Sequence, residues 1–191
     1  MSNNYSPVYL VFAYDVGGFH GTARNYKKDA LLINNNNFSA CSPAFHMLST
    51  IAFELFLKVL IALDVCIKYK DDENKSSGEI IEEISNEIKK YSHNLETLFL
   101  TFPYLMTSLN IKSISYFSND IVSEYIIKTD TQPYIPLKSL DGIRYGSFAK
   151  SKDTATLCVN DKDIIDLLNL LEEYVDKQYM QTNIELQKYF S

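Results

Sequence analysis

Residues 42–67 have the sequence SPAFHMLSTIAFELFLKVLIALDVCI and contain the most apolar stretch of the chain, residues 51–67. Serine followed by proline is typical of a helix start, because serine caps the first turn and proline is tolerated at the first helical position. Apolar side chains then recur at helical spacing and also fill much of the opposite face. A helix that is apolar nearly all round is buried on most sides. The sequence therefore predicts a central helix around which the rest of the protein packs.

The apolar stretch is about long enough to cross a membrane, but Glu54, Lys58 and Asp64 interrupt it. A charged side chain near the bilayer centre costs on the order of 2.5–3.5 kcal/mol, so a buried core helix is favoured and we expect no membrane association. The N-terminus lacks the basic segment of a signal peptide. The three cysteines are far apart and form no CxxC pair, which is typical of reduced, buried thiols. These features predict a cytoplasmic protein.

Helical spacing recurs on both sides of the central helix, with polar breaks between the segments. Residues 70–78 are charged and small, and residues 129–141 contain two prolines, so both are expected to be exposed loops. The sequence predicts an all-α fold, one domain over residues 1–191 with its core at 42–175, arranged as an up-and-down bundle of about five helices. Besides the central helix, the predicted helical segments are 7–33, 80–102 with breaks available at 92–94 and Pro103, 114–125, and 164–175.

The charge of the chain limits its partners. The formal net charge is −6 and the sequence pI is about 5.1. Nucleic-acid-binding domains usually carry a basic patch or a high pI, so we expect no DNA binding. Almost all basic residues are lysine, and Arg24 and Arg144 are the only arginines.

Several common kinds of site are absent from the sequence. It contains no phosphate-binding glycine loop, no GxGxxG fingerprint and no His/Cys cluster with metal-ligand spacing, so we expect no cofactor and no metal. The aromatic residues fall at predicted core positions, which indicates packing rather than a stacking platform for single-stranded nucleic acid. Any chemistry then depends on a few polar residues.

Two charged residues lie within the apolar helix. Glu54 and Lys58 are four residues apart with glutamate on the N-terminal side, the favourable order for an ion pair on one helix face. Charged groups among Phe, Leu and Ile side chains are usually paired or functional. Three interpretations are open: a structural pair that holds the helix in register, side chains that reach solvent, or part of a larger polar cluster.

His93 and Arg144 are the other candidate site residues. His93 lies where the sequence offers a new helix start, and its imidazole suits either a cap or surface role or general acid–base chemistry near neutral pH. Arg144, followed by Tyr145, comes after a turn and a proline-containing connection, where it either serves a function or forms an ordinary salt bridge. We interpret three further residues as structural: His20, Arg24 and His46.

The order of these segments resembles a known family. Residues 53–58 read FELFLK, residues 92–99 read SHNLETLF, and residues 143–145 read IRY. This order is similar to prokaryotic branches of the HEPN superfamily (higher eukaryotes and prokaryotes nucleotide-binding), in which an E-L-x-L-K helix precedes a G-H-x-L-x-x-L segment and a later R-Y. The resemblance covers residues 42–175. It implies a helical bundle, often dimeric, that is associated with RNA or nucleotides.

The resemblance implies two alternative functions. RNase members of the superfamily carry an arginine followed a few residues later by histidine, but no histidine follows Arg144. This departure favours a non-catalytic interaction module, associated with RNA or a nucleotide, in a prokaryotic defence or toxin–antitoxin system. Such a module is expected to be a homodimer with a partner protein, either an antitoxin or a nucleotidyltransferase.

The alternative is a divergent, metal-independent endoribonuclease toxin. His93 would then be the base and Arg144 the phosphate clamp. Glu54, Lys58 and Tyr145 would form the supporting polar cluster. The sequence itself leaves open whether the protein is an enzyme.

Overall fold

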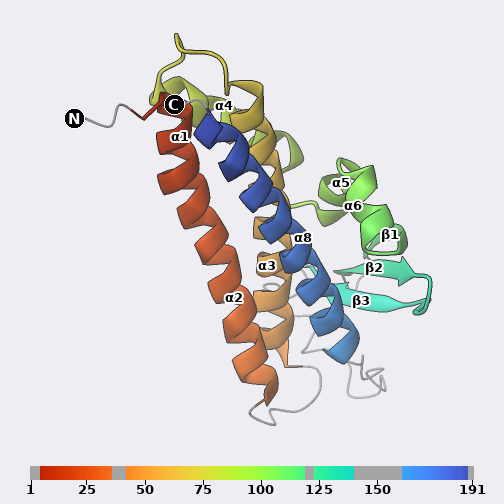
Figure 1. The fold of residues 1–191 in the computed structure, drawn as a ribbon. Coiled ribbons are helices and arrows are strands. Elements are labelled where there is room, and N and C mark those ends of the chain that lie inside the picture. Colours follow the sequence, from red (N-terminus) through yellow and green to blue (C-terminus); the bar gives the residue numbers. More distant parts are fainter. Residues whose placement is uncertain (1–4, 36–41, 119–122, 140–160, 189–191) are drawn as a thin grey trace, which may run out of the picture.

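A computed structural model describes residues 5–35, 42–118, 123–139 and 161–188 of the chain. Within these ranges the chain is mostly helical and carries one small antiparallel sheet (Figure 1). The helical elements in chain order are α1 (Pro7–Leu10), the π-helical η1 (Val11–Val16), α2 (Gly17–Asn35), α3 (Pro43–Lys68), α4 (Ser77–Tyr91), α5 (Leu95–Leu100), α6 (Pro103–Ser108) and α8 (Asp161–Gln187). The strands are β1 (Ile111–Ser118), β2 (Ser123–Thr129) and β3 (Ile135–Lys138).

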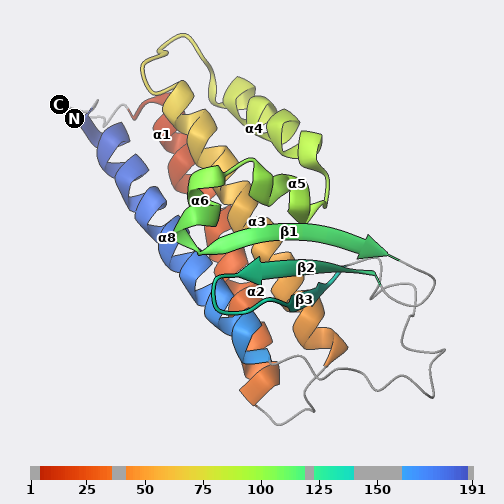
Figure 2. The ribbon, with the colours of Figure 1, turned by 90° about the vertical axis from the view of Figure 1, so that its right-hand side faces the viewer.

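The long helices lie side by side, and the sheet covers another side of α3. The elements α1, η1 and α2 form one continuous helical body, and α8 runs alongside it (Figure 1). The sheet, with α5 and α6 beside it, lies in front of these long helices when the molecule is turned by 90° (Figure 2). Helix α3 packs against α2, α4, α5, α8 and β3, and it is therefore the centre of the fold.

The predicted central helix is confirmed as α3. The Ser42 side chain accepts a hydrogen bond from the Phe45 amide, and Pro43 occupies the first turn. All residues from Phe56 to Leu63 are buried. These residues span more than two helical turns, so every face of this part of α3 is covered. Full burial of a large apolar side chain stabilises a fold by about 1.5–3 kcal/mol, which makes α3 the main source of core stability.

The all-α prediction is wrong, because the described chain includes a sheet and the fold is α+β. The three strands form an antiparallel meander in the order β1-β2-β3. The spacing of Ile114, Phe117 and Tyr125 imitates a helical period, yet Ile114 pairs with Ile127 and Tyr125 pairs with Tyr116 across two strands. β-branched and aromatic side chains suit such a pleated, half-buried surface.

An irregularity in β1 conceals its strand character. Ile111 and Ile114 are both buried although they are three residues apart. A register shift between Ile111 and Ser113 makes this possible, because it breaks the alternation of faces along the strand. Strict alternation is the main sequence signal of a half-buried strand. Its loss here explains why the sequence favours a helix.

The element boundaries differ from the predicted bundle at two further places. With α1, η1 and α2 counted as one, the described residues contain six helices, because the predicted segment 80–102 divides into α4 and α5 and Pro103 starts α6. The predicted loop 129–141 contains β3, whose first three residues are buried. Residues 70–78 are turns and irregular backbone up to Ser76, which caps α4.

His46, buried in the first turns of α3, is expected to make stability depend on pH. Burial, with a smaller contribution from the Lys138 ammonium group, lowers the pKa of His46 to about 4. Between pH 6.5 and 4 the unfolded chain therefore binds a proton at this imidazole and the folded chain does not. The free energy of unfolding is expected to decrease as the pH falls through this window, by on the order of 3 kcal/mol in total.

Denaturant unfolding of the wild type and of His46→Gln at several pH values checks this prediction. Glutamine does not titrate, so the wild type is expected to lose more stability than the variant as the pH falls. The other titrating groups are common to both proteins and cancel in the comparison. Parallel pH profiles would contradict the prediction.

Candidate functional site

The buried charges of α3 meet His93 at the protein surface. Glu54 and Lys58 lie one turn apart on α3 and are 5% and 8% exposed. The Lys58 ammonium group contacts Oε1 of Glu54, and Nδ1 of His93 lies 2.8 Å from the same oxygen. The structure thus brings together three of the predicted residues, here named the His93 cluster (His93, Glu54 and Lys58). Arg144 and Tyr145 lie outside the described residues.

A helix break holds the backbone of His93. Ser92 ends α4 with a φ of 51°, a left-handed conformation that is uncommon for residues other than glycine. Asn94 then caps α5, because its side chain accepts a hydrogen bond from the Thr97 amide at 3.2 Å. The Tyr125 hydroxyl donates to the His93 carbonyl at 3.1 Å. The local sequence therefore ends one helix, starts the next and holds His93 between them against α3.

The contacts of Glu54 indicate which nitrogen of His93 carries hydrogen. A lysine ammonium group has only donor hydrogens, so Oε1 of Glu54 is an acceptor towards Lys58. The same oxygen faces Nδ1 of His93, which we therefore assign as a donor. Nε2 of the neutral imidazole is then an acceptor. A carboxylate in this position orients the ring of a histidine and fixes which nitrogen carries the hydrogen.

The imidazole of His93 is open to solvent although its partner is buried. The side chain of His93 is 71% exposed. An exposed polar contact contributes little to stability, so the exposed ring is poorly explained by packing alone. A histidine that is exposed in this way can take a proton from a bound molecule and return it afterwards. The His93 cluster thus has the geometry of a general acid–base group held by a carboxylate.

Two tyrosines of the sheet connect it to the backbone of His93, and the sequence does not predict them there. Tyr125 contacts the His93 carbonyl through its hydroxyl, and its ring centroid lies 5.2 Å from that of Tyr116. The Tyr116 amide donates to Oε2 of Glu96 at 3.1 Å, which ties β1 to α5. The helical interpretation of residues 114–125 hides this arrangement. Only the pairing of Tyr116 with Tyr125 across the two strands would indicate it. A single sequence does not reveal this pairing.

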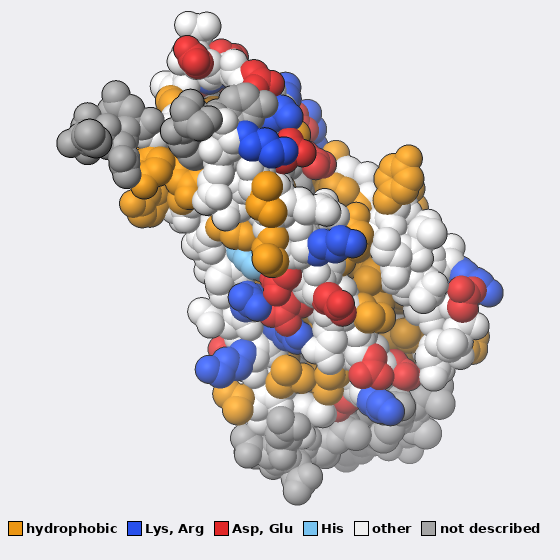
Figure 3. Space-filling model, in the orientation of Figure 1, with side chains coloured by type: hydrophobic (Ala, Val, Ile, Leu, Met, Phe, Trp, Pro, Cys, Tyr) orange, Lys and Arg blue, Asp and Glu red, His pale blue; other side chains and the backbone are white. Residues whose placement is uncertain are grey.

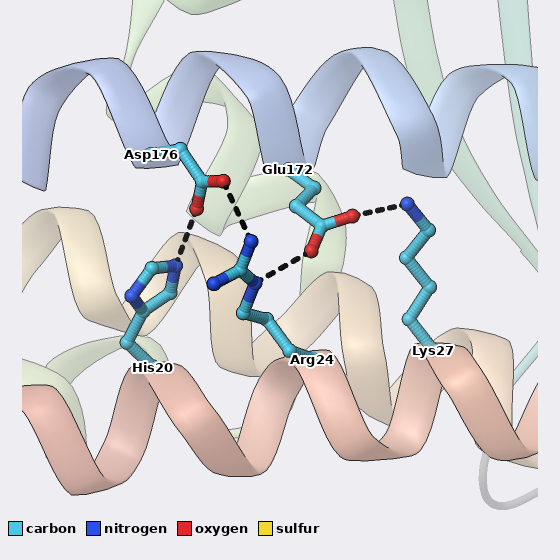
Figure 4. Close-up of polar contacts among 5 residues, drawn as sticks. All are labelled: His20, Arg24, Lys27, Glu172 and Asp176. Carbon is cyan, nitrogen blue, oxygen red and sulfur yellow. Dashed lines mark hydrogen bonds and ion pairs between the residues drawn. The ribbon is translucent and has the colours of Figure 1, made fainter.

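A second polar cluster joins α2 to α8 (Figure 4). Arg24 donates to Glu172 through Nε at 2.8 Å and to Asp176 through Nη2 at 3.0 Å, and Lys27 also pairs with Glu172. Nε2 of His20 lies 2.8 Å from Oδ1 of Asp176. Burial lowers the pKa of His20, and the nearby Asp176 carboxylate only partly opposes this shift.

The cluster between α2 and α8 has a structural explanation. Each cation on α2 faces a carboxylate on α8, so the pairing joins two helices that are far apart in the sequence. The space-filling view shows acidic and basic side chains next to each other on this face (Figure 3). The structural interpretation of His20 and Arg24 therefore agrees with the geometry.

Comparisons with known proteins leave the site to be interpreted from its geometry. No protein-family model, curated protein or solved structure matches the chain.

In the described ranges, no group of three or more His, Cys, Asp or Glu side chains is arranged to hold a metal ion. The described helices also include none with the length and apolar character needed to cross a membrane.

Removing one partner of the buried ion pair is expected to be costly. In Lys58→Met, Glu54 keeps a buried charge with only His93 beside it, so the free energy of unfolding is expected to fall by about 3–5 kcal/mol. In the double variant Glu54→Gln/Lys58→Met no uncompensated charge remains, and the loss is expected to be smaller. Urea unfolding of the wild type and both variants measures the difference.

The exposed pair of Lys68 and Glu83 provides a matched control. Lys68→Met is expected to leave stability nearly unchanged, because solvent screens this pair. A double variant less stable than Lys58→Met would contradict the proposed cause, since the penalty would then not come from the unpaired Glu54 charge.

Proposed function

We propose that the protein cleaves RNA at the His93 cluster, with His93 as the general base that removes the proton of a ribose 2′-hydroxyl. One observation carries the proposal: an exposed imidazole is held through Nδ1 by a buried carboxylate, which leaves Nε2 available to a ligand. A network that served packing alone would not require an exposed ring. The resemblance to the HEPN superfamily supplies RNA as the substrate class.

In the proposed step the 2′-oxygen attacks the neighbouring phosphorus while Nε2 of His93 takes the hydroxyl proton. The bond between phosphorus and the 5′-oxygen breaks, and the leaving oxygen takes a proton from water or a second acid. The products are one strand with a 2′,3′-cyclic phosphate and one with a 5′-hydroxyl. Glu54 stabilises the imidazolium that forms. We propose Arg144 as the phosphate clamp, with Tyr145 beside it.

The biological setting of the proposal comes from the resemblance. The HEPN pattern supports RNA as a substrate, although it implies an all-helical bundle and the described chain also carries a sheet. We propose a homodimer that works in the cytoplasm of a prokaryotic cell, in phage defence or in a toxin–antitoxin pair. A partner protein, such as an antitoxin or a nucleotidyltransferase, would then control it.

The second candidate is a non-catalytic module that binds a partner protein. The charge favours this candidate, because the net charge of −6 gives RNA little electrostatic attraction. In this interpretation Glu54, Lys58 and His93 fix the position of α3 against the junction of α4 and α5. A buried network of this kind can specify packing while adding little net stability.

An RNA cleavage assay tests the first candidate. Purified wild type is incubated with a short single-stranded RNA in the presence of EDTA, and the products are examined for 2′,3′-cyclic phosphate ends. His93→Gln is expected to lower the cleavage rate by about 10²–10⁴-fold, the usual contribution of a general base. Its melting temperature is expected to stay close to that of the wild type, since the side chain is exposed.

DNA of the same sequence is the matched substrate control, because it lacks the 2′-hydroxyl and should remain intact. Arg144→Ala is expected to lose activity in the same assay. Wild-type cleavage by His93→Gln would remove His93 from the mechanism. If the wild type leaves RNA intact and His93→Gln loses thermal stability, the non-catalytic module is the function that stands.

A further inference from the structure

Tyr116 lies at the rim of the buried face of the sheet. Ile114 precedes it on this face and Tyr125 lies opposite it, and both are buried, whereas Tyr116 is 41% exposed. The Tyr116 and Tyr125 rings are tilted by 48° with their centroids 5.2 Å apart. One side of the Tyr116 ring therefore packs on the protein, and the exposed remainder is available to a ligand.

Two contacts connect Tyr116 to the chain segment around His93. Tyr125, which packs against Tyr116, donates its hydroxyl hydrogen to the His93 carbonyl. The Tyr116 amide is bound by Glu96, which lies in the first turn after His93. The side chain of Tyr116 is therefore packed against a buried ring, and its backbone is hydrogen-bonded to α5. Tyr116 is thus connected to His93 through the Tyr125 ring and through the first turn of α5.

The polar groups around Tyr116 suit an uncharged ligand group. Ser118 follows Tyr116 on the same face of β1, and its hydroxyl lies 2.8 Å from that of Ser123 on β2. The charged side chain bound to the Tyr116 backbone is the Glu96 carboxylate. The carboxylate repels phosphate and the hydroxyls do not neutralise its charge, whereas a nucleobase offers a flat face and donors at its edge.

We infer that Tyr116 is a stacking platform for a nucleobase of single-stranded RNA, which positions the attached ribose at His93. The inference rests on the proposed function and names how that site recognises its substrate. Stacking on an aromatic ring tolerates different bases, because every base has a π-face. It also supplies affinity that does not depend on basic residues, which suits a chain of net charge −6. The expected substrate is an unpaired strand, whose bases are free to stack.

Tryptophan fluorescence measures binding at this ring directly. The chain contains no tryptophan, so Tyr116→Trp introduces a single reporter and keeps an aromatic face. The probe is a 2′-O-methyl oligoadenylate, which binds through its bases but lacks the nucleophile for cleavage. Saturable quenching is expected with this probe, and an abasic oligomer of equal length is expected to bind at least about five-fold more weakly.

Tyr14 supplies the matched control for the reporter. It is 76% exposed on η1, across the molecule from the sheet (Figure 1). Tyr14→Trp is expected to show no saturable quenching. Equal quenching of the two variants, or equal binding of the abasic oligomer, overturns the platform, because binding would then be unspecific or carried by the backbone.

A second pair of variants separates the platform from the cleavage step. Tyr116→Leu is expected to weaken binding of the same oligoadenylate, labelled with a fluorophore, by at least about five-fold, while Tyr116→Phe retains it. Binding without cleavage by the wild type would keep the platform and remove the proposed RNase activity. Cleavage with an unchanged KM in Tyr116→Leu would keep the RNase activity and overturn the platform.

Discussion

The need to cover α3 on every side is the constraint on which the structure depends. No single layer can bury a helix that is apolar all round. The N-terminal helix and α8 cover one side, and α4, α5 and the sheet cover others. This requirement explains why a mostly helical protein contains a small sheet. The strands form part of the cover of the central helix rather than a separate domain.

A charged pair in such a helix creates a second constraint. Glu54 and Lys58 cannot remain unpaired in this interior without a large penalty, and their spacing along one helix face lets them pair with each other. The Glu54 oxygen that binds Lys58 also contacts His93, which links the buried helix to an exposed imidazole. The same contact therefore holds the buried pair to the surface and, in the proposed reaction, orients the histidine for proton transfer. This double use is the physical basis of both candidate functions.

The two polar clusters described above differ in whether they leave a polar group available to a ligand. Between α2 and α8, Arg24 and Lys27 are matched by Glu172 and Asp176, so their charges are neutralised within the protein. In the His93 cluster, Nδ1 of the imidazole contacts Glu54, and Nε2 belongs to a ring that is exposed to solvent. The exposed Tyr116 is connected to the His93 cluster through Tyr125, and the interpretation of the aromatic residues as packing does not describe that ring. A site is therefore better supported at His93.

The sequence by itself determined the features that depend on near neighbours: the central helix, its cap at Ser42, the helix start available after His93 and the i, i+4 spacing of Glu54 and Lys58 on one helix face. These follow from helical geometry and capping, which act within a few residues. Only the tertiary structure decided which distant segments meet. His93 reaches Glu54 across 39 residues, and Tyr116 faces Tyr125 because two strands pair in one register. The irregularity in β1 removed the alternation that would have predicted a strand, so the sheet could not be derived from the sequence pattern. Contacts of this kind depend on how the whole core is filled, and no local spacing contains that information.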